Sequence, residues 1–138
     1  MSSWPALLLG ATGVHAGFQA TVTLLVYPAL ADVPDDLWTT AHARHSRRIT
    51  PLVAVVYVVL AVACAGALLH DPASPGPWVA GVGAAGAALA TAAGAAPTHG
   101  RLASGLTPEL IRRLLLADRV RCGAGLLSLG GGLLTVLG

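Results

Sequence analysis

Long apolar runs separated by short polar segments dominate the chain. Four such runs lie at about residues 5–28, 49–69, 78–96 and 109–137. They lack the regular alternation of polar and apolar residues that marks the strands of a membrane barrel, so each run predicts a helix. About 20 apolar residues cross a hydrocarbon core of about 30 Å, and each run reaches that length. The pattern predicts a single all-α domain, an integral membrane antiparallel four-helix bundle.

The connections between the runs differ in kind. Residues 31–50 form a longer connection with a helical stretch expected from Asp35 or Asp36 onward, residues 70–77 form a proline-rich turn, and residues 97–106 read as a short polar loop. Thr107-Pro108-Glu109 is a helix-start signal, because it places an N-cap hydroxyl before a proline and an acid. The first run lacks the basic segment of a signal peptide, so we interpret it as a retained membrane helix.

Composition supports a membrane location. Hydrophobic residues make up 55% of the 138 residues and charged residues 10%, whereas soluble domains carry about 25% charged residues. This polar surface is too small to cover a globule in water. We therefore expect the lipid bilayer to be the main partner of the chain, and we expect no nucleic-acid partner.

Arginine placement predicts the orientation. The chain has eight basic residues, all arginine: Arg44, Arg47, Arg48, Arg101, Arg112, Arg113, Arg119 and Arg121. Four crossings place all of them at the same side of the membrane, and the positive-inside rule assigns that side to the cytoplasm. The sequence thus predicts a multi-pass protein of the plasma membrane with arginine-rich loops in the cytoplasm and both termini outside.

Small residues indicate close helix packing. The third run is nearly all glycine and alanine, and the first contains Gly13-x-x-x-Gly17. Such residues let helix backbones approach closely in lipid. Tight packing within the four-helix bundle accounts for them; a homo-oligomer is compatible with the pattern but is not indicated by it.

The first helix carries a polar stripe at spacings of three and four, formed by Thr12, His15, Gln19, Thr23 and Tyr27. Such spacing places the side chains on a single helix face. Polar groups at membrane depth usually face a bundle interior or a cavity. We interpret the threonines as an interhelical hydrogen-bond seam, whereas His15 and Gln19 fit a structural or a functional role equally well.

Further polar side chains flank the other runs. His42 and His45 are three residues apart and are able to share a metal, although a histidine pair beside arginines is also typical of a stretch that binds lipid phosphate. His99 follows the third run. On the fourth helix, Asp118 and Arg121 have the spacing of an intrahelical ion pair.

The crossings bring these groups to one end of the bundle. We expect a pocket there, with the first helix lining a shaft below it. The predicted metal ligands are His15, His42, His45 and His99. The predicted catalytic side chains are Asp118, Arg121, Gln19 and Tyr27. Imidazoles with few carboxylates favour copper first and iron second, with a bis-histidine haem as a third option.

Three stretches carry a resemblance to a known family: HAGFQATVTLLVYPAL from His15, WTTAHARHSRRITP from Trp38 and PTHGRLASGLTPELIRRLLLADRVR from Pro97. Together they resemble small four-helix membrane proteins related to the anthrone oxygenases of aromatic polyketide pathways. Such proteins often have Asn-Trp-x-Arg where this chain has Asp118 to Arg121. The resemblance implies oxidation of a small lipophilic molecule, often aromatic, with molecular oxygen as co-substrate.

The sequence therefore predicts a membrane-embedded, metal-dependent oxidase or oxygenase of natural-product biosynthesis. One alternative is a small transporter or channel, which would have to oligomerise because the chain shows no internal repeat of the transporter kind. Another is a non-catalytic membrane partner in which the arginines bind anionic lipid or a protein. Metal analysis, flux measurements and histidine replacement distinguish the three.

Overall fold

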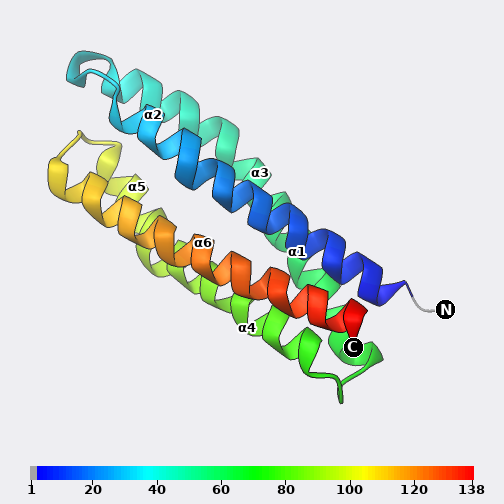
Figure 1. Cartoon of the computed structure of the whole chain (residues 1–138). Helices are drawn as coiled ribbons and strands as arrows, with labels where there is room; N and C mark the ends of the chain where they lie inside the picture. Colours follow the sequence, from blue (N-terminus) through cyan, green and yellow to red (C-terminus); the bar gives the residue numbers. More distant parts are fainter. Residues whose placement is uncertain (1–2) are drawn as a thin grey trace.

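The protein, described here over residues 3–138 in a computed structural model, is all-α and consists of four packed helical rods (Figure 1). The first rod is α1 (Trp4–Thr21), η1 (Val22–Val26) and α2 (Tyr27–Ala31), and the second is α3 (Asp35–His70). The third is α4 (Pro75–Ala90), η2 (Thr91–Ala95) and α5 (Ala96–Leu102), and the fourth is α6 (Pro108–Leu137). Each rod is long and apolar enough to span a membrane.

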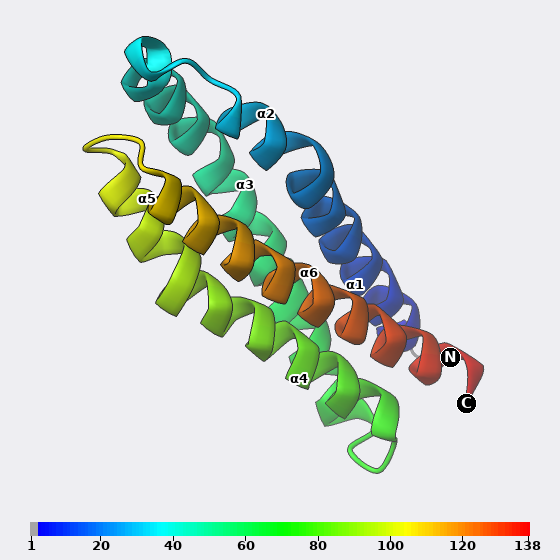
Figure 2. The ribbon, with the colours of Figure 1, turned by 60° about the vertical axis from the view of Figure 1, so that its left-hand side comes forward.

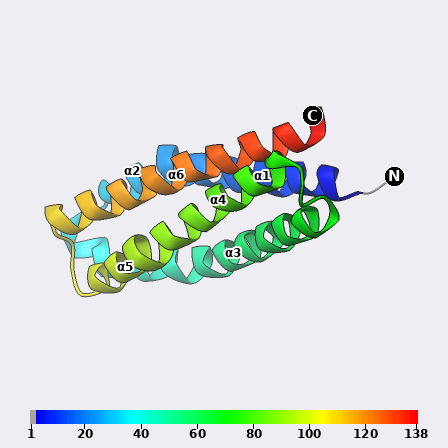
Figure 3. The same ribbon diagram turned by 90° about the horizontal axis from the view of Figure 1, so that it is seen from below.

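The rods run alternately up and down. The connections after α2 and after α5 lie at one end of the bundle, while the turn between α3 and α4 lies at the other end, with the start of α1 and the end of α6 (Figures 1 and 2). Seen from below, the four rods form one elongated bundle (Figure 3). This arrangement confirms the predicted fold, and it confirms that the connections after the first and third rods lie at the same end.

Large apolar side chains cover the outside of the bundle. Leu24, Val58 and Leu89 are between 63% and 70% exposed, and many other leucines and valines are similarly placed. Such a surface is stable only against lipid. The exposed faces therefore contact a bilayer, and the chain is a multi-pass membrane protein.

The closest packing joins α4 and α6. A methyl group added at Gly83 would lie 2.8 Å from the Cα atom of Ser128, and one added at Gly131 would lie 2.7 Å from the Cα atom of Ala80. The packing role predicted for the small residues is thus right for these helices. It is wrong for Gly13 and Gly17, where a methyl group would meet no described atom within 4 Å.

The third rod continues past its predicted end. Residues 97–106 were expected to form a loop, but the helix extends to Leu102 and the connection is only residues 103–107. Proline lacks an N–H and crowds the carbonyl four residues back, which normally breaks a helix. Here the π-helical segment η2 lies just before Pro97, and the N–H of Ala96 donates to the carbonyl five residues back, on Thr91. This wider turn lets the helix pass the proline.

The first rod also contains a π turn just before a proline. The segment η1 precedes Pro28, and the N–H of Tyr27 donates to the carbonyl of Val22, again five residues back. The start of α6 follows its predicted signal, because the Thr107 hydroxyl accepts a hydrogen bond from the Leu110 N–H at 3.2 Å. These local features place Tyr27, His99 and the first turns of α6 at the same end of the bundle.

Candidate functional site

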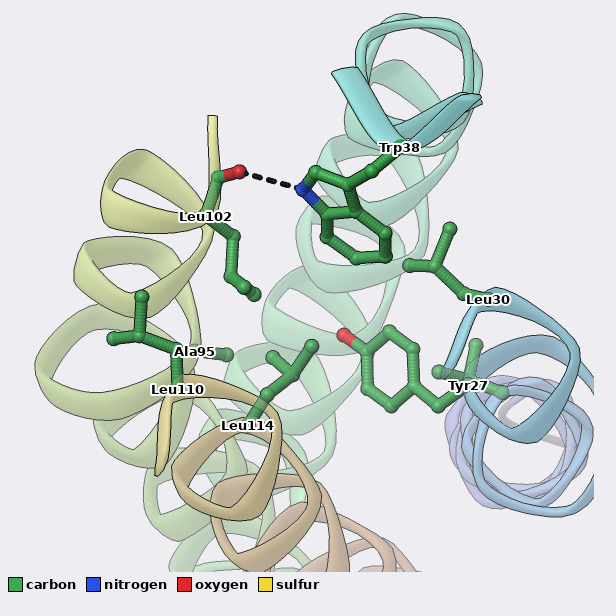
Figure 4. Close-up of a cluster of buried hydrophobic side chains, with 8 residues drawn as sticks. Tyr27, Leu30, Trp38, Ala95, Leu102, Leu110 and Leu114 are labelled. Carbon is green, nitrogen blue, oxygen red and sulfur yellow. Dashed lines mark hydrogen bonds between the residues drawn. The ribbon is translucent and has the colours of Figure 1, made fainter. Parts of the chain in front are cut away.

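A buried apolar layer closes the connection end of the bundle. Trp38, which is 1% exposed, donates a hydrogen bond from its indole Nε1 to the Leu102 carbonyl at 2.9 Å and so ties α3 to α5. Figure 4 shows this bond, with Leu30 of α2 beside the Trp38 ring and the Tyr27 side chain pointing toward Leu114 of α6. This apolar layer holds in place the helices that carry the polar side chains of the site.

Three histidines gather beside this layer. The ring of His42 stacks on Trp38, with centroids 5.2 Å apart, and on His99 at 5.3 Å, while His45 stacks on His99 at 5.9 Å. His42 Nε2 and His99 Nδ1 are 3.1 Å apart and share a hydrogen bond. The structure thus brings together the three histidines that the crossings were expected to bring together.

Tyr27 connects the histidines to Arg121. Its hydroxyl lies 3.0 Å from His99 Nε2 and accepts a hydrogen bond from Arg121 Nη1 at 3.4 Å. Tyr27 directly follows η1 and His99 lies four residues after η2. Because a π turn adds a residue to the local register, it rotates the side chains that follow it around the helix axis. The two π turns therefore help to aim Tyr27 and His99 at each other.

The polar chain continues toward the middle of the bundle. Arg121 Nη2 donates to Gln19 Oε1 at 2.9 Å, and Gln19 Nε2 donates to the Tyr57 hydroxyl at 3.4 Å. The Tyr57 and Thr91 hydroxyls are 2.9 Å apart. Tyr57 and Thr91 were not among the predicted site residues, and the only available signal was that each is a lone polar residue inside an apolar run.

The predicted ion pair between Asp118 and Arg121 does not form. Both side chains point inward, with 1% and 3% exposure, but Arg121 reaches across to the first rod. Neither carboxylate oxygen of Asp118 has a hydrogen-bond partner among the described residues. The spacing correctly predicted that both groups lie on the inner face of α6. The ion-pair prediction is wrong, because Gln19 and Tyr27 of the first rod provide the acceptors for the Arg121 guanidinium.

His15 lies apart from the histidine stack. It is fully buried, its ring meets the Tyr57 ring edge-on at 5.2 Å, and it packs over Gly125 of α6. Neither of its ring nitrogens has a hydrogen-bond partner within residues 3–138. His15 therefore lies deep in the bundle, apart from the three histidines with which it was predicted to share a metal, and it meets the polar chain only through the Tyr57 ring.

The histidines do not form a ready metal site. Among the described residues, no group of three or more His, Cys, Asp or Glu side chains is arranged to hold a metal ion. Imidazole lone pairs lie in the ring plane, so the stacked rings of His45 and His99 present faces rather than converging nitrogens. The predicted copper or iron ion stays a prediction, which elemental analysis of the purified protein tests.

A hollow of about 280 Å³ lies beside the polar chain, between α3 and the third rod. Its lining is Tyr27, Ser46, Ile49, Thr50, Val53, Thr91, Ala95, Ala96, His99 and Arg121. Thr50 and Ala96 are exposed on the lipid-facing surface. The hollow therefore has apolar walls, a polar wall formed by Tyr27, His99 and Arg121, and an edge at the surface of the bundle.

Comparison with known proteins gives no family assignment. No family model matches the chain, and neither a curated protein nor a solved structure matches it significantly. What the structure supports is the general description of a small membrane protein with four long apolar helices. Function must therefore be argued from the geometry of the site.

Proposed function

We propose that this protein is a membrane-embedded oxygenase that uses molecular oxygen to oxidise a small lipophilic aromatic substrate. The observation that carries the proposal is the hollow between α3 and the third rod, which combines apolar walls with Tyr27, His99 and Arg121. Binding sites of this kind are mostly apolar, with a few polar groups that fix orientation. An edge at the lipid-facing surface suits a substrate that partitions into the bilayer.

The volume of the hollow indicates the size of the substrate. A protein cavity of about 150 Å³ accepts benzene. A hollow of about 280 Å³ is almost twice as large, and it is partly open, so it accommodates two or three fused rings. When the rings of the substrate pack against Ile49, Val53 and Ala95, an oxygen substituent on a ring or an activated ring carbon lies at the polar wall.

The polar wall has the groups for proton abstraction. The Tyr27 hydroxyl and His99 Nε2 are 3.0 Å apart, within the range for proton transfer. A substrate proton passes to the tyrosine oxygen as the tyrosine proton passes to His99, and the hydrogen bond from His99 to His42 extends the path. Arg121, which touches the Tyr27 hydroxyl, stabilises negative charge that develops on the substrate oxygen.

The reaction balances with oxygen as the oxidant. A ring methylene loses a proton to the Tyr27–His99 pair. The carbon of the resulting enolate reduces O2 and forms a bond to it, and the peroxide then takes up a proton to give a hydroperoxide. Loss of water then leaves a carbonyl, so one oxygen atom enters the product and the other leaves as water. No step of this proposal runs through the predicted metal.

We also propose that the site faces the cytoplasm across the inner leaflet of the plasma membrane. All eight arginines lie in the half of the bundle that carries the connections after α2 and α5, and such a bias marks the cytoplasmic side. A reporter fused to the C-terminus tests this directly. Activity of a reporter that works only outside the cytoplasm supports the orientation, and activity of a cytoplasmic reporter contradicts it.

Oxygen uptake tests the catalytic proposal. Purified protein in liposomes is given an anthrone, and an oxygen electrode compares the wild type with His99→Gln and with His70→Gln, a matched change at an exposed histidine at the opposite end. Loss of general acid–base catalysis is expected to slow His99→Gln by about 100-fold or more, with His70→Gln unchanged. Uptake no faster than in protein-free liposomes across anthrones, naphthols and hydroquinones would contradict the proposal.

A further inference from the structure

Arg121 is a buried cation whose hydrogen-bonding capacity is only partly used. Its side chain is 3% exposed, and a guanidinium has five N–H donors. The structure gives it hydrogen bonds to Gln19 Oε1 and the Tyr27 hydroxyl. Its Nε is buried without a partner among the described residues. The acceptors that it does have are neutral oxygens.

No carboxylate is bonded to this cation. Within residues 3–138, the side-chain ion pairs join Glu109 to Arg112 and Arg113, and all three are exposed. Asp118 is buried near Arg121, but neither of its oxygens receives a hydrogen bond from a described group. Charged side chains inside membrane bundles are costly and usually pair with a charge or face a cavity. Arg121 borders the hollow, so a ligand there is able to supply an anionic acceptor in hydrogen-bond contact, which Asp118 does not provide.

We propose that the hollow binds its ligand as an aromatic oxyanion, an ionised phenol, with Arg121 as the counter-cation. This inference rests on the proposed function in that it assigns the substrate class of the same hollow. Hydrogen bonds between a guanidinium and an anionic oxygen are about twice as strong as neutral ones. Arg121, at the polar wall of the hollow, provides such bonds, and the apolar walls receive the rings.

The rest of the lining argues against a more highly charged ligand. Arg121 is the only arginine that lines the hollow, and Ile49, Val53 and Ala95 form its apolar wall. Phosphate groups are usually bound by several cations or by backbone N–H groups at a helix N-terminus. A single negative charge spread over an aromatic system matches one guanidinium and needs less hydration than a phosphate.

Ligand binding without oxygen tests the inference. Protein in detergent micelles is titrated under nitrogen with 4-nitro-1-naphthol, which is ionised at neutral pH, with 2-naphthoate and with uncharged naphthalene. The wild type is compared with Arg121→Gln and with Arg119→Gln, which removes an exposed arginine of the same helix. Loss of a charge-assisted bond is expected to weaken naphtholate binding about tenfold or more in Arg121→Gln, with little change for naphthalene and none in Arg119→Gln.

A second variant distinguishes the loss of the Arg121 charge from misfolding. Arg121→Lys keeps the charge without the fork of donors, so its naphtholate affinity is expected to lie between those of the wild type and Arg121→Gln. Tighter binding of the naphtholate than the naphthoate supports an ionised phenol, and the reverse overturns that assignment in favour of a carboxylate. Equal affinity of wild type and Arg121→Gln for both anions overturns the oxyanion site altogether.

The two proposals fail in different ways. Oxyanion binding that depends on Arg121, without any oxygen uptake, would leave the binding inference standing and contradict the oxygenase. Oxygen uptake with no preference for anionic ligands would support the oxygenase and contradict the binding inference.

Discussion

The close approach of α4 and α6 gives a quantitative prediction for two adjacent glycines. In Gly131→Ala, the added methyl group would lie 2.7 Å from both the Ala80 Cα atom and the Gly76 carbonyl oxygen. In Gly130→Ala, it would meet no described atom within 4 Å. Favourable contacts with carbon need about 3.5–4.0 Å, so the first change forces α4 and α6 apart by about 1 Å and the second does not.

The difference between the two variants isolates the packing effect. Both substitutions replace a glycine in the interior of α6 and gain the same helix propensity, about 1 kcal/mol. This gain cancels in the comparison. Overpacking costs about 1–3 kcal/mol, so Gly131→Ala is expected to be less stable than Gly130→Ala by that amount. Against the wild type, Gly130→Ala is expected to be equally or more stable.

Unfolding of the purified protein in detergent measures this difference. Both variants and the wild type are followed by circular dichroism during heating or during titration with a denaturing detergent. Equal stability of Gly131→Ala and Gly130→Ala would contradict this prediction, because it would mean that the α4 and α6 backbones are not in contact at Gly131.

Three further substitutions test the site and its support. Tyr27→Phe removes the hydroxyl that contacts His99 and accepts from Arg121, so we expect turnover to fall about 10- to 100-fold and the free energy of unfolding to fall by about 1–3 kcal/mol, because a buried Arg121 donor loses its acceptor. Trp38→Phe leaves the buried Leu102 carbonyl without its donor, and we expect a loss of about 1–3 kcal/mol in the free energy of unfolding. Asp118→Asn removes a buried carboxylate that has no described hydrogen-bond partner, so a higher melting temperature is expected, and a lower one would show that the carboxylate is paired.

The fold was largely predictable because lipid imposes a simple pattern. Apolar runs of membrane length identified the four rods, and the arginine-bearing connections identified the end where the polar groups meet. The continuation of the helix through Pro97 was not predictable from local sequence, because proline beside glycine and polar residues is typical of a loop. The π turn before it depends on how the whole rod packs.

The part of the site that follows from the order of the membrane-spanning helices alone was predictable. The approach of His42, His45 and His99 needed only the order of the helices. Contacts between particular side chains were not predictable: the spacing of Asp118 and Arg121 favoured a local ion pair, whereas the structure gives Arg121 acceptors on another rod. Tyr57 and Thr91 escaped notice because a single polar residue in an apolar run has no repeating pattern.

We propose that this bundle inserts oxygen into a lipophilic aromatic substrate at the Tyr27–His99–Arg121 wall. Mass spectrometry of the product formed from an anthrone under ¹⁸O-labelled oxygen detects this insertion. We expect wild-type protein in liposomes to yield the quinone with one labelled oxygen atom much faster than protein-free liposomes, and we expect Arg121→Gln not to do so. Labelled quinone formed at the same rate with and without the protein would contradict the proposed oxygenase function.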